Sequence, residues 1–196
     1  MGRKTWDSIP ASKKPLKNRL NVVLTQDPEK LVEQMNEQMV DQETVSVFSD
    51  FKKALESLSS DEGVGEIFVI GGTSLFDMSY GKNAEFKNHC KLIMATRINK
   101  EFECDVFSRD LEKDNSDFPP IHVSQTYSQG DITFDYCLFG NAELLSARPE
   151  LVPTRLIEKF PKHPELQYLE IIDDVIKTGK FKQDRTGTGI YTKFGA

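Results

Sequence analysis

Residues 66–76 constrain the fold of this chain more than any other stretch of its sequence. They read Glu-Ile-Phe-Val-Ile-Gly-Gly-Thr-Ser-Leu-Phe, so four consecutive apolar residues lead directly into a double glycine. An uninterrupted apolar run of this length predicts a strand that is buried on both faces. The glycines permit positive φ and a close approach of a ligand to the backbone, and Thr73 or Ser74 can cap a helix. Such a turn suits a pyrophosphate, but many buried strands end in a glycine turn without a ligand, and both interpretations stay open.

The composition excludes several classes of protein. The 196 residues carry a formal net charge of −6, which argues against nonspecific binding to nucleic acid or to an anionic membrane. No apolar run approaches the roughly 20 residues of a membrane span, and the N-terminal sequence lacks the pattern of a signal peptide. The three cysteines show neither disulfide nor zinc-ligand spacing. We therefore expect a cytoplasmic protein with reduced thiols and with no metal, nucleic-acid or membrane partner.

Alternating strand and helix patterns predict an α/β fold with a mixed, mostly parallel sheet, flanking helices and a C-terminal antiparallel hairpin. Ser49 is expected to cap a helix that runs to about residue 58, whereas residues 27–44 are acidic, glutamine-rich and only weakly periodic, as in a surface insertion. The expected strands are 21–25, 45–48, 67–70 and 91–98, and the expected hairpin pairs 123–128 with 132–139.

The pattern changes after Gly140. Residues 141–163 carry three prolines and are expected to form a linker with one short helical turn. Residues 164–179 have the spacing of an amphipathic helix, whose apolar face has no obvious partner in the rest of the chain. A glycine-rich stretch and a short strand follow. The sequence therefore predicts one domain over residues 1–140 and the beginning of a second over 164–196.

Two short segments carry side chains that suit a phosphate. Arg3, Lys4 and Thr5 stand at the start of a predicted helix, where two cations, a hydroxyl and free N–H groups come together. Thr25 and Gln26 follow a predicted strand, at the end where ligands gather in open α/β sheets. A solvated basic helix start and a plain turn explain the same patterns, so neither segment alone indicates a site.

Three further side chains have similar alternatives. Arg19 follows an apolar Pro-Leu pair and suits either a ligand carboxylate or a surface ion pair. Thr96 lies on an apolar strand, where a buried hydroxyl needs either a ligand or a carbonyl as its partner. Arg185 stands among flexible residues and suits either a phosphate or a charged turn.

Six motifs follow one another along residues 1–140: Gly-Arg-Lys-Thr-Trp-x-Ser-Ile-Pro, Pro-Leu-Lys-x-Arg, Val-Val-Leu-Thr, Ile-Gly-Gly-Thr-Ser-Leu-Phe, Ala-Thr-Arg-Ile and Phe-Glu-Cys-Asp. In this order they resemble dihydrofolate reductase. Residues 164–196, with Glu-Leu-Gln-Tyr-Leu and Asp-Arg-Thr-Gly-Thr-Gly, resemble the beginning of thymidylate synthase, an α+β domain. The tandem is similar to the fused bifunctional enzyme of protists and plants. The resemblance implies a reductase domain over 1–140, a linker over 141–163 and the start of a synthase domain over 164–196.

The resemblance also implies ligands and residue roles. NADPH would reduce dihydrofolate by hydride transfer to C6 of the pteridine, with protonation at N5, and Thr96 would bond the acidic residue that supports this protonation. The family often has a basic residue where Gln26 stands, so Arg3 would carry more of the preference for NADP over NAD. The implied cofactor-binding residues are Arg3, Lys4, Thr5, Thr25, Gln26, Gly71, Gly72, Thr73, Ser74, Leu75 and Phe76. The implied substrate-binding residues are Ile9, Pro10, Leu16, Arg19 and Ile70, together with Arg185 for the phosphate of dUMP.

By the same resemblance, both catalytic centres lie partly outside the chain. The family's first strand, its mobile loop and the helix with the pteridine-binding carboxylate precede the position of Met1, and the synthase's catalytic cysteine follows that of Ala196. We therefore expect a fragment of an enzyme that also methylates dUMP with 5,10-methylenetetrahydrofolate and forms a homodimer through its synthase domain.

Two alternatives remain open at this point. One is a non-catalytic NADPH-binding module, or an inert fragment, which would lack the catalytic half. The other is a generic doubly wound dinucleotide-binding domain, which requires a Gly-x-Gly-x-x-Gly motif after a first strand. The Gly-Thr-Gly near the C-terminus does not supply that motif.

Overall fold

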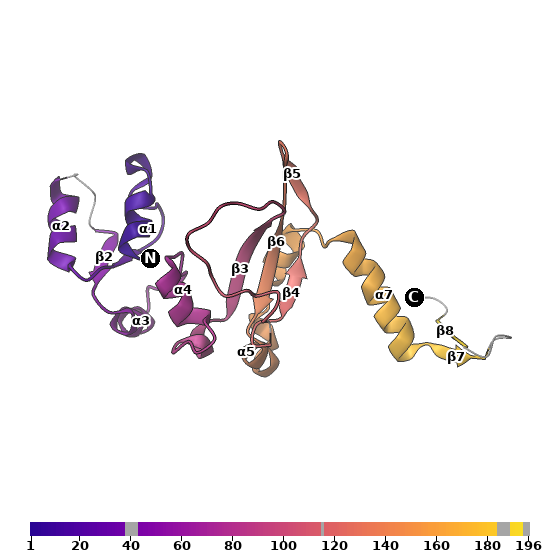
Figure 1. Cartoon of the computed structure of the whole chain (residues 1–196). Coiled ribbons are helices and arrows are strands. Elements are labelled where there is room, and N and C mark those ends of the chain that lie inside the picture. Colours follow the sequence, from indigo (N-terminus) through magenta and orange to yellow (C-terminus); the bar gives the residue numbers. More distant parts are fainter. Residues whose placement is uncertain (38–42, 115, 184–188, 194–196) are drawn as a thin grey trace. The chain divides into compact units, whose positions relative to one another are not determined.

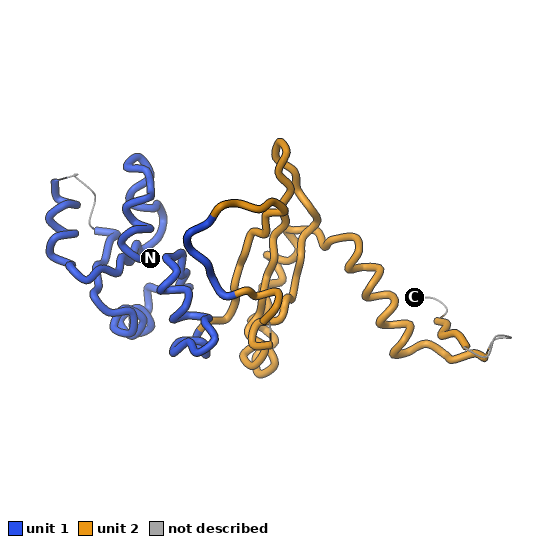
Figure 2. Tube along the Cα trace, viewed as in Figure 1, with its two compact units in different colours: residues 1–89, 104–109 blue, residues 90–103, 110–196 orange. Residues whose placement is uncertain are grey.

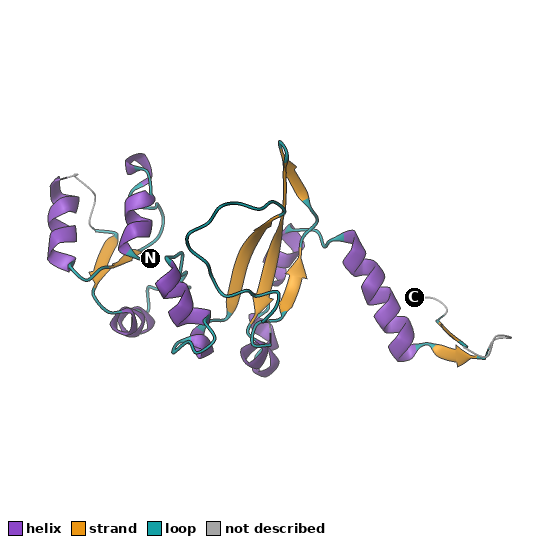
Figure 3. Cartoon of the chain, viewed as in Figure 1, coloured by secondary structure: helices purple, strands orange, loops and turns teal. Residues whose placement is uncertain are grey.

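A computed structural model describes residues 1–37, 43–114, 116–183 and 189–193. The chain forms two compact units, which are coloured separately in Figure 2. Both units contain helices and strands, as Figure 3 shows. The first unit comprises Met1–His89 and Cys104–Arg109, and the second comprises Cys90–Glu103 and Asp110–Ala196.

The first unit is built on a short parallel strand pair (Figure 1). Strand β1 (Asn21–Leu24) pairs in parallel with β2 (Val45–Phe48), and both lie where the sequence predicted a strand. Helix α3 begins after Asp50, whose side chain accepts a hydrogen bond from the Lys53 N–H at 2.8 Å, one residue beyond the expected Ser49 cap. The helices of this unit are α1 (Arg3–Ser8), α2 (Pro28–Glu37), α3 (Phe51–Ser59) and α4 (Thr73–Tyr80), with 3-10 turns η1 (Ala11–Lys13) and η2 (Lys87–His89).

Helix α2 supplies part of the core of the first unit. Leu31 and Met35 are buried and cluster with Trp6 and Val23, so the expectation of a surface insertion is wrong for this helix. The two side chains are one helical turn apart and therefore share a face, and two apolar residues are enough to bury that face. Their burial fixes α2 against α1 and β1.

The apolar run 67–70 does not form the predicted strand. These residues lie in irregular structure that leads to α4, and Ile67, Phe68 and Ile70 are 42%, 60% and 45% exposed. A strand requires a neighbour for its N–H and C=O groups, and none of the described strands pairs with this run. The α/β class is confirmed. Parallel pairing, however, is found only between β1 and β2 among the described strands.

The second unit contains an antiparallel sheet with the strand order β3-β6-β4, in which β5 also pairs with β6. The predicted C-terminal hairpin is confirmed: β5 and β6 are joined at Gly130, which has a φ of +63°. The expected strand 123–128 is divided between β4 and β5. The four strands are β3 (Leu92–Ile98), β4 (Pro120–Val123), β5 (Tyr127–Gln129) and β6 (Ile132–Gly140).

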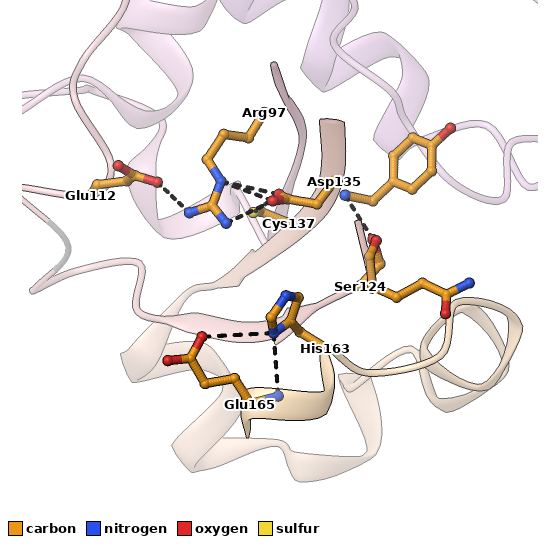
Figure 4. A network of polar contacts seen from close by, with 9 residues as sticks. Arg97, Glu112, Ser124, Asp135, Cys137, His163 and Glu165 are labelled. Carbon is orange, nitrogen blue, oxygen red and sulfur yellow. Dashed lines mark hydrogen bonds and ion pairs between the residues drawn. The ribbon is translucent and has the colours of Figure 1, made fainter. Parts of the chain in front are cut away.

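A charged network ties residues 110–114 to one face of this sheet (Figure 4). Asp135 is buried, and its carboxylate lies 2.8 Å from Nη2 of Arg97 on the neighbouring strand. Arg97 also reaches Glu112, with Nη1 at 2.6 Å from Oε1. Hydrogen bonds to the two carboxylates raise the pKa of Arg97, which therefore stays cationic and neutralises the buried Asp135.

Residues 141–163 contain more structure than the single helical turn that was predicted. Beyond its helices, the segment joins the outer edge of β4, where the Gln125 N–H donates to the Pro161 carbonyl at 2.8 Å and the His163 N–H to that of Val123 at 3.1 Å. Backbone pairing of this kind fixes the path of the chain without a large core. The helices are α5 (Ala142–Ala147) and α6 (Thr154–Lys159), with the 3-10 turn η3 (Pro149–Leu151) between them.

The predicted amphipathic helix is confirmed as α7 (Pro164–Thr178), which ends at Gly179. The hairpin of β7 (Lys180–Lys182) and β8 (Ile190–Thr192) follows it. At least half of the surface of the apolar side chains Tyr168, Leu169, Ile171 and Ile176 on this helix is exposed. The helical pattern therefore predicts the local structure correctly. On the predicted apolar face, Leu169 and Ile176 are exposed, whereas Leu166, Ile172 and Val175 are half-buried.

The three cysteines should differ sharply in reactivity. Desolvation raises the pKa of Cys90 to about 11 and that of Cys137 to about 12, whereas Cys104 is exposed. Because the thiolate is the nucleophile, we expect iodoacetamide to label Cys104 in the native protein near neutral pH, and Cys90 and Cys137 only after denaturation. Mass spectrometry of the labelled peptides measures this. Native labelling of Cys137 as fast as that of Cys104 would contradict the buried position of Cys137.

The same two thiols should make stability fall at high pH. A pKa that is higher in the folded than in the unfolded state favours folding below the ordinary value of 9.0, and this contribution is lost as the pH rises toward 11 and 12. The thermal unfolding midpoint should accordingly decrease above about pH 9, and less steeply in Cys137→Ala. If the unfolding midpoint fell equally steeply with pH in the variant and in the wild type, Cys137 would not be a cause of this loss of stability.

Candidate functional site

Three segments that the sequence singled out meet in the first unit. The Gly2 N–H donates a hydrogen bond to the Gly71 carbonyl at 2.8 Å, across 69 residues of chain. Gly2 also forms a parallel bridge with Leu24, the last residue of β1, and the Leu24 N–H donates to the Met1 carbonyl at 2.8 Å. The start of α1, the end of β1 and the double glycine therefore lie side by side. Their pairing is what brings the predicted phosphate-binding residues together.

The double glycine has a backbone that only glycine adopts readily. Gly71 has a φ of +113°, and a Cβ built on it would lie 3.3 Å from the Thr5 hydroxyl oxygen. The Gly71–Gly72 peptide bond is cis. Gly72 is the N-cap of α4, although Thr73 or Ser74 was predicted to take this position. Because Thr73 is already the first helical residue, no side chain caps this helix end. The Leu75 and Phe76 N–H groups donate to the Gly72 carbonyl at 3.0 and 3.2 Å, which leaves the N–H groups of Thr73 and Ser74 for a ligand.

The remaining residues of the helix start differ in exposure. Ser74 is exposed, whereas the side chain of Leu75 is buried and Phe76 packs beside Gly71. Ser74 therefore has a hydroxyl available for a ligand. Leu75 offers a ligand neither its side chain nor its N–H, since the side chain belongs to the core and the N–H donates to the Gly72 carbonyl at 3.0 Å. The positive end of the α4 dipole adds to the attraction for an anion at this point.

The predicted cations stand at the neighbouring helix start. Lys4 is exposed. Arg3 is half-buried: its Nε donates to both carboxylate oxygens of Asp7 at 2.9 and 3.0 Å, and its Nη2 donates to the side-chain carbonyl of Gln34 on α2. The Thr5 hydroxyl thus lies at the glycine turn, and two cations stand in the helix whose start pairs with that turn. This set of donors suits a diphosphate.

The segment after β1 supplies the other predicted contacts on this side. The Thr25 N–H donates to the Phe48 carbonyl at 3.0 Å, and the Thr25 hydroxyl accepts from the Asp27 N–H at 3.3 Å. The hydroxyl is therefore held next to the end of the parallel strand pair. Gln26 is exposed and adds a neutral amide there. The carboxyl end of a parallel strand is where open α/β sheets bind ligands.

Asn21 is a residue of this region that the sequence did not single out. It is 1% exposed, and its side chain forms two hydrogen bonds of 3.0 Å with the backbone of Leu16, one with its N–H and one with its C=O. A third bond of 3.1 Å reaches the carbonyl of Arg19. Asn21 thereby fixes the loop that carries Leu16 and Arg19. No local pattern indicates this role, because an asparagine at the start of a strand has many ordinary explanations.

The other predicted substrate-binding residues also belong to the first unit. Ile9 packs on the core cluster, Pro10 precedes η1 and is exposed, and Leu16 is half-buried. Arg19 is exposed, with its Nε donating to the Lys17 carbonyl at 3.0 Å. Ile70 directly precedes the double glycine and is 45% exposed. Apolar and cationic groups are therefore both available along this part of the chain.

Thr96 differs from its expected environment. It lies on β3 in the second unit and is exposed, so the prediction of a buried hydroxyl is wrong. Leu156 of α6 and Phe160 pack on part of the face that carries Thr96 and Tyr136. Beside them, Thr96, Ile98, Phe134 and Tyr136 line a shallow depression of about 530 Å³. Arg185 lies outside the described residues.

Two further properties concern the described ranges as a whole. No group of three or more His, Cys, Asp and Glu side chains in them is arranged to hold a metal ion. None of their helices combines the length and the hydrophobicity that crossing a bilayer requires.

Comparison with known proteins gives one consistent result. A family model described as dihydrofolate reductase matches residues 1–139. The whole chain is 31% identical to the bifunctional dihydrofolate reductase-thymidylate synthase of Zea mays and 27% identical to that of Plasmodium chabaudi, covering 39% of each. It is 30% identical to bifunctional dihydrofolate reductase-thymidylate synthase 1 of Arabidopsis thaliana, covering 38%. The chain thus spans about two fifths of the length of the relatives that it matches.

Gly71→Ala should destabilise the first unit, because alanine is strained at a φ of +113° and its Cβ would press on Thr5. We expect the free energy of unfolding in urea to fall by about 1–3 kcal/mol. Gly65→Ala is the matched control, since a Cβ there meets no atom within 4 Å. Equal stability of the two variants would mean that Gly71 does not need its positive φ.

Proposed function

Because the chain belongs to the dihydrofolate reductase family, we propose that its first unit binds NADPH and acts in the reduction of dihydrofolate to tetrahydrofolate. The observation that carries this proposal is the junction of Gly2, Leu24 and Gly71. It brings a basic helix start, a strand end and an uncapped helix N-terminus around one glycine turn. The family match covers all three segments.

The donors at this turn fit the phosphates of NADPH. The uncapped N–H groups of α4, the Ser74 hydroxyl and the Thr5 hydroxyl are the groups we assign to the pyrophosphate. Gly71 and Gly72 allow the pyrophosphate to approach the backbone, where a side chain would fill the space. The remaining cofactor contacts in the proposal come from Arg3, Lys4, Thr25, Gln26, Thr73, Leu75 and Phe76.

The folate contacts are proposed from the segment between α1 and β1. Ile9, Pro10 and Leu16 would form an apolar wall for the aminobenzoyl group, from which water is excluded. Arg19 would bind the glutamate α-carboxylate through its planar guanidinium, in the loop that Asn21 fixes. The Ile70 carbonyl, beside the cofactor turn, would accept a hydrogen bond from the pteridine.

The mechanism that follows divides the work between cofactor and protein. NADPH, when bound, supplies the hydride that reaches C6 of the pteridine. The chain's own residues would hold the phosphates of NADPH and the carboxylate of dihydrofolate at fixed points. The two molecules would thus be oriented relative to each other before they react. Thr96 would position a carboxylic acid that delivers the proton to N5. In the structure its hydroxyl is exposed on β3 and therefore available for such a partner.

The full-length protein is proposed to be a bifunctional enzyme. All three relatives described above carry both activities in their names and match this chain over its whole length. In this proposal residues 164–196 begin a synthase domain that methylates dUMP with 5,10-methylenetetrahydrofolate, forms a homodimer and binds the dUMP phosphate through Arg185. Residues 141–163 would be the linker between the two domains.

A second candidate is an NADPH-binding module without catalysis. It is favoured by a difference between the predicted cofactor-binding residues and the predicted proton-delivery residue Thr96. The cofactor residues converge in the first unit, whereas Thr96 is exposed and no carboxylate among the described residues is bonded to it. Without a positioned acid, proton delivery would be slower by a factor on the order of 10²–10⁴.

A turnover assay on the intact chain separates these candidates. Both predict binding of NADPH, measured by calorimetry, and only the first predicts turnover, measured as dihydrofolate-dependent loss of NADPH absorbance. Lys4→Ala should weaken NADPH binding because it removes one cation from the phosphate site, whereas Lys52→Ala, an equal change of charge on the exposed face of α3, should not. Absence of NADPH binding by a chain with a folded circular-dichroism spectrum would refute both.

A further inference from the structure

Arg3 is held by two different helices. Its Nε donates to both carboxylate oxygens of Asp7, one turn further along α1. Its Nη2 donates to Oε1 of Gln34, which projects from α2. Gln34 is half-buried, in a helix that Leu31 and Met35 anchor in the core. The guanidinium is therefore fixed by one contact within its own helix and by one contact from α2.

We propose that Gln34 is a positioning residue that sets the preference for NADPH over NADH by holding the Arg3 guanidinium toward the adenosine 2′-phosphate. This inference deepens the proposed function and rests on it. It assigns a role to α2, which the sequence analysis did not connect with the site. NADH lacks the 2′-phosphate, so an effect that acts through this group changes the affinity for NADPH alone.

The hydrogen-bond geometry of Arg3 supports this role. A guanidinium has five N–H donors, of which Nε uses one for Asp7 and Nη2 uses one for Gln34. The two donors on Nη1 and the second on Nη2 have no protein partner among the described residues. This free edge matches the bidentate geometry that phosphate prefers.

Conformational entropy explains why Gln34 contributes to affinity without touching the ligand. A free arginine loses rotamer freedom when a phosphate fixes it, and this loss weakens binding. Asp7 and Gln34 impose much of that order before the ligand arrives. The side chain of Arg3 is 29% exposed, so it remains partly accessible to solvent.

Charge explains why a neutral amide suits this position. Asp7 already places one carboxylate on the guanidinium. A second carboxylate at position 34 would keep the hydrogen bond to Arg3, but it would repel a phosphate that carries up to two negative charges. Glutamine supplies the acceptor oxygen without the charge. Since Gln26 is also neutral, Arg3 is a principal cation left for the 2′-phosphate in this region.

The test is the ratio of the NADPH and NADH dissociation constants, measured by calorimetry on the full chain. In Gln34→Ala we expect NADPH binding to weaken by about threefold to tenfold as Arg3 becomes mobile, with NADH changed by less than about twofold. Gln34→Glu should weaken NADPH binding at least as much, through repulsion. Asn36→Asp is the matched control, because it adds the same charge to an exposed position on another side of α2.

Each outcome supports or overturns a distinct statement. The inference is supported if both Gln34 variants keep the thermal midpoint of the wild type and show a lower preference for NADPH over NADH, while Asn36→Asp keeps the preference of the wild type. An unchanged preference in both Gln34 variants, or an equal loss in Asn36→Asp, would overturn it and leave the proposed function standing. Failure of the folded wild type to bind either dinucleotide would overturn the proposed function and this inference with it.

Discussion

The hydrogen bond from the Gly2 N–H to the Gly71 carbonyl is the interaction on which the candidate site depends. Together with the bridge between Gly2 and Leu24, it joins three segments that are far apart in the sequence. Without it, the cations at positions 3 and 4 would have no fixed place beside the start of α4. The position of the site therefore depends on backbone pairing, whereas the side chains around it affect the affinity and specificity for a ligand.

The elements with strong local patterns were predicted correctly from the sequence. Strands β1 and β2, helix α7 and the β5–β6 hairpin all follow from apolar periodicity and turn residues, because these signals act within a few residues. Six ordered motifs were enough to identify the family. The same motifs indicate which residues form a site, but they do not indicate which other residues position those side chains.

The remaining features depend on contacts between distant residues. The run 67–70 has the composition of a buried strand, but burial requires a neighbouring strand, which no local pattern can supply. Thr96 was expected to be buried for the same reason and is exposed, on a face of the sheet that α6 covers only in part. Conversely, Asn21 and Gln34 carry no motif, and only the folded chain shows that one fixes the loop of Arg19 and the other fixes Arg3.

In our proposal, the glycine turn and the two helix starts beside it form the NADPH site. Backbone amide chemical shifts, followed while NADPH is added to the isotope-labelled chain, test this most directly. We predict that the largest changes fall on Gly2, Thr5, Gly72 and Thr73, with small changes on the strands of the second unit. Changes confined to other residues, or no changes at all at saturating NADPH, would contradict the claim.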